Sequence, residues 1–179
     1  MQRSFLVVSL TALLFLAAEV LPAAASGPWR AQIVDAETKQ ALQGVVVLAV
    51  WTRHVRGLGG PSSEYHHSEE VLTDQDGRFT IPARSFFSLN PLVFFRGPRF
   101  LIFKPGYGWG IWPGGKQRER WPEEDLENIV IELPRLKTLD ERKEYLSKVG
   151  AGFSTVPPEK TPLLEKAITE ERRAVGFRN

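Results

Sequence analysis

The chain of 179 residues contains no cysteine, so it holds neither disulfides nor a lipid attached to cysteine. It has only three histidines, His54, His66 and His67, all in one short stretch. This grouping leaves no histidine for a spaced Ser-His-Asp triad, and no serine stands in a Gly-x-Ser-x-Gly setting. Neither sign of charge dominates, because 23 basic residues are interspersed with 21 acidic ones for a net charge of +2. We therefore predict no enzyme activity and no nucleic-acid partner.

One long apolar run is present, over residues 5–18 near the N-terminus. Arg3 precedes it, and Ala23 and Ala25 form an Ala-x-Ala cleavage site, which is the layout of a secretory signal. The run is shorter than the roughly 20 residues that span a bilayer, and Glu19 interrupts its far end. We predict a signal peptide over residues 1–25 and an exported protein, periplasmic or extracellular. After cleavage it would not be an integral membrane protein; a retained anchor is the alternative.

The middle of the chain carries strand patterns without intervening helical ones. Apolar, β-branched and aromatic residues mark strands over residues 29–35, 44–51, 70–73, 78–82, 100–104 and 129–133. The run over 44–51 is apolar throughout, so we place it at the centre of the fold. Residues 53–68 are predicted to form a loop, because glycine, proline and serine punctuate them. The spacing favours an all-β, antiparallel sandwich.

The segment Asp74-Gln75-Asp76-Gly77 predicts a hairpin between residues 70–73 and 78–82. Aspartates suit a type I turn, and Gly77 supplies the positive φ that closes it. We expect Phe79 and Ile81 to face the core. A calcium loop is the alternative, but the glutamate required at its twelfth position is missing.

The composition changes near residue 136, where a helical tail is predicted. Thr138 and Glu141 have the spacing of a capping box, and Thr161 with Pro162 has the pattern of a second helix start. The expected apolar stripes are Leu139, Leu146 and Val149 in the first helix, and Leu164, Ala167, Ile168 and Val175 in the second. Neither helix is long enough to be stable alone, so we expect residues 136–179 to pack on the sandwich or on a partner.

Three segments, residues 31–47, 72–82 and 100–107, stand in the order and spacing of a known family. Together they resemble the carboxypeptidase regulatory-like domain over residues 28–134. The resemblance implies a seven-stranded antiparallel Ig/prealbumin-like (transthyretin-like) sandwich in a stand-alone exported bacterial member. It also implies a noncatalytic accessory module without a cofactor. Two departures from the family pattern are a longer insertion over residues 84–97 and the tail of two short α-helices.

The histidines are the candidate metal ligands. His66 and His67, with Glu69, Glu70 and more distantly His54, offer imidazole and carboxylate groups that suit divalent transition metals. Adjacent residues of an extended chain point to opposite sides, so only one of the two neighbouring histidines would reach a given ion. A solvated loop is therefore the favoured interpretation, and a metal-dependent enzyme or metal binder is an alternative.

The aromatic loop over residues 107–121 is the predicted binding site. Tyr107, Trp109, Trp112 and Trp121 alternate there with glycines, and such rings stack on sugars or fill pockets in partner proteins. The competing interpretation is that the rings fold back onto the core or the tail. We expect a noncatalytic module that acts in protein interaction or envelope structure, with an envelope protein or glycan as partner. A carbohydrate-binding module is the alternative that uses the same loop.

Overall fold

The computed structural model describes residues 27–57, 60–112 and 129–177. Its strands are β1 (Trp29–Asp35), β2 (Val46–Gly57), β3 (Gly60–Leu72), β4 (Arg78–Ile81), β5 (Val93–Phe103), β6 (Gly110–Trp112) and β7 (Val130–Leu133). Two α-helices follow, α2 (Leu139–Lys148) and α3 (Pro162–Ala174), with the 3-10 turns η2 (Ala151–Phe153) and η3 (Pro158–Lys160) between them. The predicted signal peptide lies outside the described residues.

The strands form two sheets, one with the order β4-β1-β7 and one with the order β3-β2-β5-β6. The pair β1–β7 is parallel, whereas every other strand pair described is antiparallel. The prediction of a mainly β chain with two short C-terminal helices is confirmed. The prediction of a wholly antiparallel, seven-stranded sandwich is corrected to a mixed three-stranded sheet and a separate four-stranded sheet. An apolar period of two marks a strand but carries no information about the direction of its partner.

The two sheets share one hydrophobic core. The small sheet contributes alternate residues of β1, β4 and β7, and the larger sheet contributes alternate residues of β2 and β5. These buried side chains are Trp29, Ala31, Ile33, Phe79, Ile81, Ile131 and Leu133 on one side, and Val47, Ala49, Trp51, Phe100 and Ile102 on the other. The predicted inward face of residues 78–82, formed by Phe79 and Ile81, is confirmed.

Residues 46–51 of β2 are buried on both faces, which explains the unbroken apolar sequence there. Val47 and Ala49 enter the core between the sheets, whereas Val46, Leu48 and Val50 enter a second core beneath the tail. A strand with one wet face would alternate apolar and polar residues. The predicted central position is confirmed, because β2 pairs with β3 on one side and β5 on the other.

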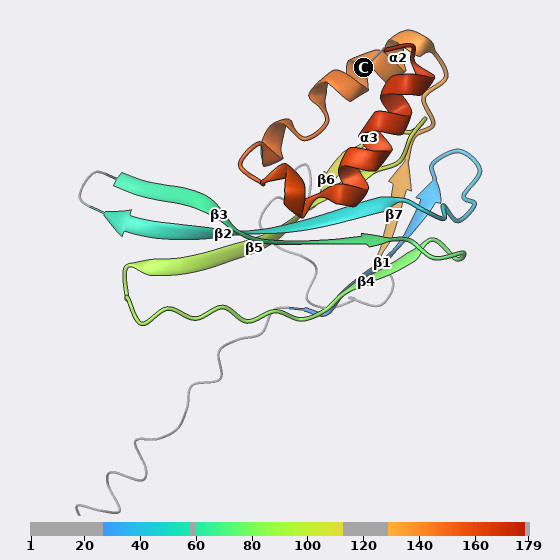
Figure 1. Ribbon diagram of the computed structural model, residues 1–179. Coiled ribbons are helices and arrows are strands. Elements are labelled where there is room, and N and C mark those ends of the chain that lie inside the picture. Colours follow the sequence, from blue (N-terminus) through green and yellow to red (C-terminus); the bar gives the residue numbers. More distant parts are fainter. Residues whose placement is uncertain (1–26, 58–59, 113–128, 178–179) are drawn as a thin grey trace, which may run out of the picture.

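The tail packs in cis on the face of the larger sheet that points away from β1 and β4, as Figure 1 shows. The predicted capping box of α2 is present: the N–H of Glu141 donates to Thr138 Oγ1, and the Glu141 carboxylate accepts from the N–H of Thr138. The predicted stripe of α3 is buried, as are Leu146 of α2 and the turn residue Phe153. Leu139 is wrong as a stripe residue, because its side chain is 52% exposed.

The start of α3 is capped by a residue from the sheet. Thr161, the predicted cap, makes no side-chain cap bond, and its hydroxyl donates instead to Pro158 O. The Glu70 carboxylate of β3 accepts the N–H groups of Leu163 and Leu164, both at 2.9 Å. Glu70 thus satisfies two of the N–H donors that the first turn of α3 leaves open, and it fixes α3 on the sheet.

An ion pair joins the two helices. Arg142 of α2 donates from Nε and Nη2 to the two carboxylate oxygens of Glu171 in α3, each at 2.7 Å. The backbone N–H of Gly106, in the β5–β6 turn, also donates to Glu171. Glu171 is only 2% exposed, so these donors offset the burial of its charge. The tail and the sheet therefore form one packed unit.

The segment 74–77 makes the predicted turn but not the predicted hairpin. Asp74 Oδ1 accepts the N–H groups of Asp76 (3.0 Å) and Arg78 (2.8 Å), and Gly77 has a φ of +69°. The strands that the turn joins, β3 and β4, belong to different sheets. Turn chemistry sets the local chain reversal, whereas the pairing of β4 with β1 depends on the core.

The predicted loop over residues 53–68 is wrong. β2 continues to Gly57 and β3 begins at Gly60, so these residues pair along a long ribbon. Three strands, β2, β3 and β5, extend beyond the small sheet, as Figure 1 shows. We call this three-stranded projection the arm; it consists of residues 52–57 of β2, 60–67 of β3 and 93–97 of β5. Among the described helices, none is long and apolar enough to cross a membrane.

Candidate functional site

Two of the aromatic residues predicted to bind a ligand, Tyr107 and Trp109, have described side chains, and both are hydrogen-bonded within the fold. Tyr107 Oη donates to Asp35 Oδ2 at 3.1 Å, and its ring packs against the core between the sheets. Trp109 Nε1 donates to the carbonyl oxygen of Tyr145 in α2 at 2.9 Å, and its ring packs on the second core. The backbone of Trp112 pairs with Phe100, but its side chain and all of Trp121 lie outside the described residues.

The partner of Tyr107, Asp35, organises the turn after β1. Its Oδ1 accepts the N–H groups of Glu37 (2.8 Å) and Thr38 (2.9 Å), and these bonds hold the pKa of Asp35 below its usual range. Burial, with the neighbouring Asp35 carboxylate, raises the pKa of Tyr107. The hydroxyl therefore stays protonated and donates. This pair ties the β1 turn to the residues that follow β5, which is a structural role.

A β-bulge places His66 and His67 on the same side of β3. Trp51 pairs with His67 and Thr52 with Tyr65, so His66 is the extra residue. Both imidazoles contact the ring of Phe86, with centroid distances of 4.7 Å for His66 and 5.8 Å for His67. The prediction that they point to opposite sides is wrong, because the bulge interrupts the alternation.

The histidines pack on aromatic rings. His67 lies 5.4 Å from Trp51 by ring centroids, and burial followed by the charge of Arg84 lowers the pKa of His67. His54 stacks on Phe94 at 5.2 Å and an interplanar angle of 16°. Within residues 27–57, 60–112 and 129–177, no group of three histidine or acidic side chains is arranged to hold a metal.

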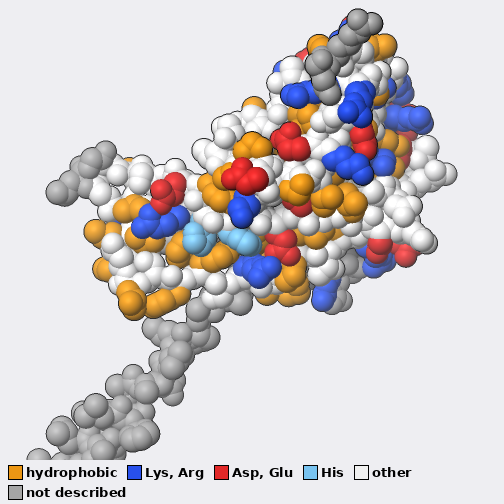
Figure 2. Space-filling model, viewed as in Figure 1, with side chains coloured by type: hydrophobic (Ala, Val, Ile, Leu, Met, Phe, Trp, Pro, Cys, Tyr) orange, Lys and Arg blue, Asp and Glu red, His pale blue; other side chains and the backbone are white. Residues whose placement is uncertain are grey.

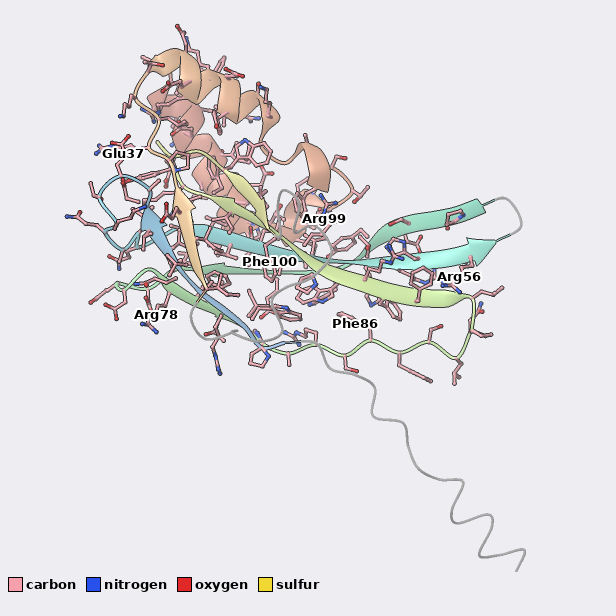
Figure 3. The ribbon with its side chains drawn as sticks, turned by 180° about the vertical axis from the view of Figure 1, so that it is seen from behind. Glu37, Arg56, Arg78, Phe86, Arg99 and Phe100 are labelled. Atoms are coloured by element: carbon pink, nitrogen blue, oxygen red, sulfur yellow. The ribbon has the colours of Figure 1, made fainter. Side chains whose placement is uncertain are left out.

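The inner face of the arm, which continues the core between the sheets, carries an aromatic cluster. Residues 82–92, which connect β4 to β5, run beneath it, and Phe86 from this connection lies against the arm in Figure 3. Phe86 contacts Trp51 at 5.9 Å and Phe95 at 5.6 Å by ring centroids. A hollow of about 310 Å³ opens between the connection and β5, and its lining includes Trp51, Phe86, Phe95 and Arg84. Figure 2 shows the histidines as pale-blue surface beside hydrophobic and charged side chains.

The outer face of the arm continues the surface on which the tail packs. Opposed residues of neighbouring antiparallel strands share a face. His54 opposes Phe94 and Ser63, while Thr52 opposes Arg96 and Tyr65. Tyr65 packs against the second core, which lies beneath the tail helices. The outer face of the arm is therefore the same side of the larger sheet that the helices cover.

Arginine side chains gather around Phe94 on the outer face. The guanidinium carbon of Arg56 lies 5.0 Å from the centroid of the Phe94 ring, and that of Arg96 lies 5.3 Å from it. The guanidinium carbon of Arg99 lies 4.9 Å from the centroid of the Phe153 ring in the tail, where this face meets η2. Burial, and then the charge of Arg96, lowers the pKa of His54, so its imidazole is neutral at pH 7. The positive charge of this face therefore comes from arginine alone.

The residues of the arm were missed because residues 53–68 were predicted to be a loop. The available signal was symmetry: Gly57, Gly59 and Gly60 lie between two runs, 51–56 and 62–67, of similar length and strand-compatible composition. Read this way, the glycines mark the tip of a hairpin.

No protein-family model, curated protein or solved structure matches this chain. The function must therefore be inferred from the geometry of the described residues.

Proposed function

We propose that the chain is an exported, noncatalytic module that binds a protein partner through the arm. The observation that carries the proposal is the extension of β2, β3 and β5 beyond the small sheet. Ordering each residue of such an extension costs about 1–2 kcal/mol of backbone entropy, and little core is gained in return. A binding surface gives a reason for this extension that stability alone does not.

The resemblance of residues 28–134 to the carboxypeptidase regulatory-like family supports the same proposal, because that family consists of accessory modules. Membership of the family and its Ig/prealbumin-like fold remain part of the proposal. The charged start, apolar run and Ala-x-Ala site of residues 1–25 support export to the periplasm or outside. Mass spectrometry of the protein purified from its own cell tests export, and a mature chain that begins at Ser26 is the expected result. A chain that retains residues 1–25 would contradict it.

No observation on the described residues specifically favours either alternative, the carbohydrate-binding module or the metal site. A glycan site needs exposed ring faces, whereas Tyr107 and Trp109 are half-buried and hydrogen-bonded within the fold. A metal centre needs converging ligands, whereas His54 and His66 face different aromatic rings, Phe94 and Phe95. We therefore retain protein binding as the proposed function.

Site-directed photocrosslinking tests the proposed function. The photoreactive residue p-benzoylphenylalanine is placed at Ser63, which is exposed on the outer face, and in a separate variant at Lys166, which is exposed on α3. Illumination of the cells that make the protein should yield a discrete adduct from position 63 and none from position 166. No adduct from position 63, or the same adducts from both positions, would overturn the proposal.

A further inference from the structure

We infer that the outer face of the arm, together with the adjoining Arg99, binds an acidic segment of the partner protein, whose carboxylates pair with Arg56, Arg96 and Arg99. This inference rests on the proposed function and names the chemistry of the partner. Its basis is the distribution of charge between the two faces of the arm.

Among the described residues, one ion pair of the arm lies on its inner face, and a second lies beside it on the same side. Arg53 pairs with Glu64, its cross-strand neighbour, and Arg84 of the β4–β5 connection pairs with Glu69 at 2.8 Å. Glu69 opposes Ala49, which lies in the core between the sheets, so this pair is also on the inner side. The carboxylates of the inner face thus neutralise its arginines.

The outer face has the arginines without the carboxylates. Arg96 opposes Thr52, and Arg99 opposes Val50 of the second core, so both project on this side. Arg56 lies two residues beyond His54 and shares its face by the period of a strand. Within the part of the chain that the structure describes, no carboxylate forms an ion pair with any of these three side chains.

The guanidinium groups are held in place but retain donors. Arg56 and Arg96 both lie in cation–π contact with Phe94, which restricts their rotamers and lowers the entropy lost when they bind. A cation–π contact uses no N–H donor, so the guanidinium N–H groups remain for a carboxylate. Figure 3 shows Arg56 near the tip of the arm and Arg99 on the side of the tail, so the charges follow the length of the arm.

An extended acidic segment fits this arrangement. Alternate side chains of a strand lie about 7 Å apart on one face, so acidic residues at every second position would meet successive arginines along the arm. Bidentate pairing of arginine with carboxylate is strong and directional. Nucleic acid fits less well, because the face is narrow and the whole chain has a net charge of only +2.

The test compares charge removal on the two faces. The outer-face variant is Arg56→Gln plus Arg96→Gln. The matched control is Arg53→Gln plus Arg84→Gln, which removes the same charge from the inner side, at the arm and at the β4–β5 connection beneath it. The probe is a fluorescent peptide of alternating glutamate and valine, and a glutamine–valine peptide serves as the neutral comparison. Fluorescence anisotropy at two salt concentrations gives the dissociation constants, and thermal unfolding verifies that each variant folds.

We expect the acidic peptide to bind wild-type protein at least about tenfold more tightly than the neutral peptide, and more weakly as salt rises. The outer-face variant should lose about tenfold in affinity, and the inner-face control should stay within about twofold. Equal binding of the two peptides, or an equal loss in both variants, would overturn the inference. Tighter binding of single-stranded DNA or of phosphatidylglycerol vesicles than of the acidic peptide, lost in the outer-face variant, would also overturn it in favour of a phosphate-bearing ligand.

The photocrosslink at Ser63 separates the two proposals. If the adduct forms equally well in the outer-face variant, the arm binds a protein but its arginines do not select it, and only the inference fails. If no adduct forms in wild-type protein, the proposed function fails as well.

Discussion

Replacement of Glu70 by alanine tests how the tail is held on the sheet. The Glu70 carboxylate accepts two N–H groups in the first turn of α3, each at 2.9 Å. Alanine leaves Leu163 and Leu164 without these acceptors at a half-buried helix end, and the loss of such a cap costs about 1–2 kcal/mol. We therefore expect the free energy of unfolding to fall by that amount and the Tm by roughly 3–7 °C for a chain of this size.

Urea unfolding, followed in parallel by circular dichroism and tryptophan fluorescence, measures this loss. The matched control is Glu165→Ala, which removes an exposed carboxylate from the first turn of the same helix. It should change the free energy of unfolding by no more than about 0.5 kcal/mol. The reasoning is refuted if Glu70→Ala is as stable as wild type, or if both variants lose equally.

The pH dependence gives a second measurement on the same residue. Burial raises the pKa of Glu70 above its ordinary value of 4.5, against the opposing effect of the Leu163 and Leu164 donors. Because the folded protein then binds this proton more tightly than the unfolded chain, the linked stabilisation is full below pH 4.5 and is lost as the pH rises through the folded-state pKa. Wild-type protein should therefore lose stability relative to Glu70→Gln as the pH rises above about 4.5. If the stability of wild type relative to Glu70→Gln stays constant or increases as the pH rises, the raised pKa of Glu70 is contradicted.

Three further substitutions test other contacts by the same unfolding assay. Gly77→Ala should cost at least about 3 kcal/mol, because a Cβ there would overlap the carbonyl oxygen of Ile33, whereas Gly44→Ala, with a similar φ and open space, should cost only about 1 kcal/mol. Equal losses would show that backbone strain alone matters. Arg142→Ala should cost about 3–5 kcal/mol by leaving the buried Glu171 charge unpaired, and adding Glu171→Gln should recover part of it; no recovery would rule out the charge as the cause. Tyr107→Phe should cost about 1 kcal/mol through its lost bond to Asp35, and an unchanged stability would mean that the bond is not formed in solution.

The candidate site was the least predictable part of the molecule. The sequence directed attention to Tyr107 and Trp109, since glycine-flanked aromatic residues are typical of ligand loops. In the fold, both side chains are hydrogen-bonded to segments distant in sequence, Tyr107 to Asp35 and Trp109 to Tyr145. The arginines around Phe94 attract no attention in the sequence, because only strand register shows that Arg56 and Arg96 share a ring.

Features that depend on neighbouring residues could be predicted from the sequence. The capping box of Thr138 and Glu141, the reversal at Asp74 to Gly77, the central position of β2 and the buried stripe of α3 are all present. Each follows from a local requirement: donors at a helix end, a positive φ in a turn, or a period that matches one buried face.

Features that join distant segments were decided only by the tertiary structure. Glu70 caps a helix that begins more than 90 residues later, and β7 lies parallel to β1. The bulge at His66 reverses the expected alternation of two histidines, and β2 and β3 extend into the arm where a loop was predicted. Such pairings depend on which packing buries the most apolar surface with every polar group satisfied, and that balance is set by the whole chain. The sequence by itself determined strands, turns and helix starts. The tertiary structure alone determined that Arg56, Arg96 and Arg99 lie on the same side of the larger sheet.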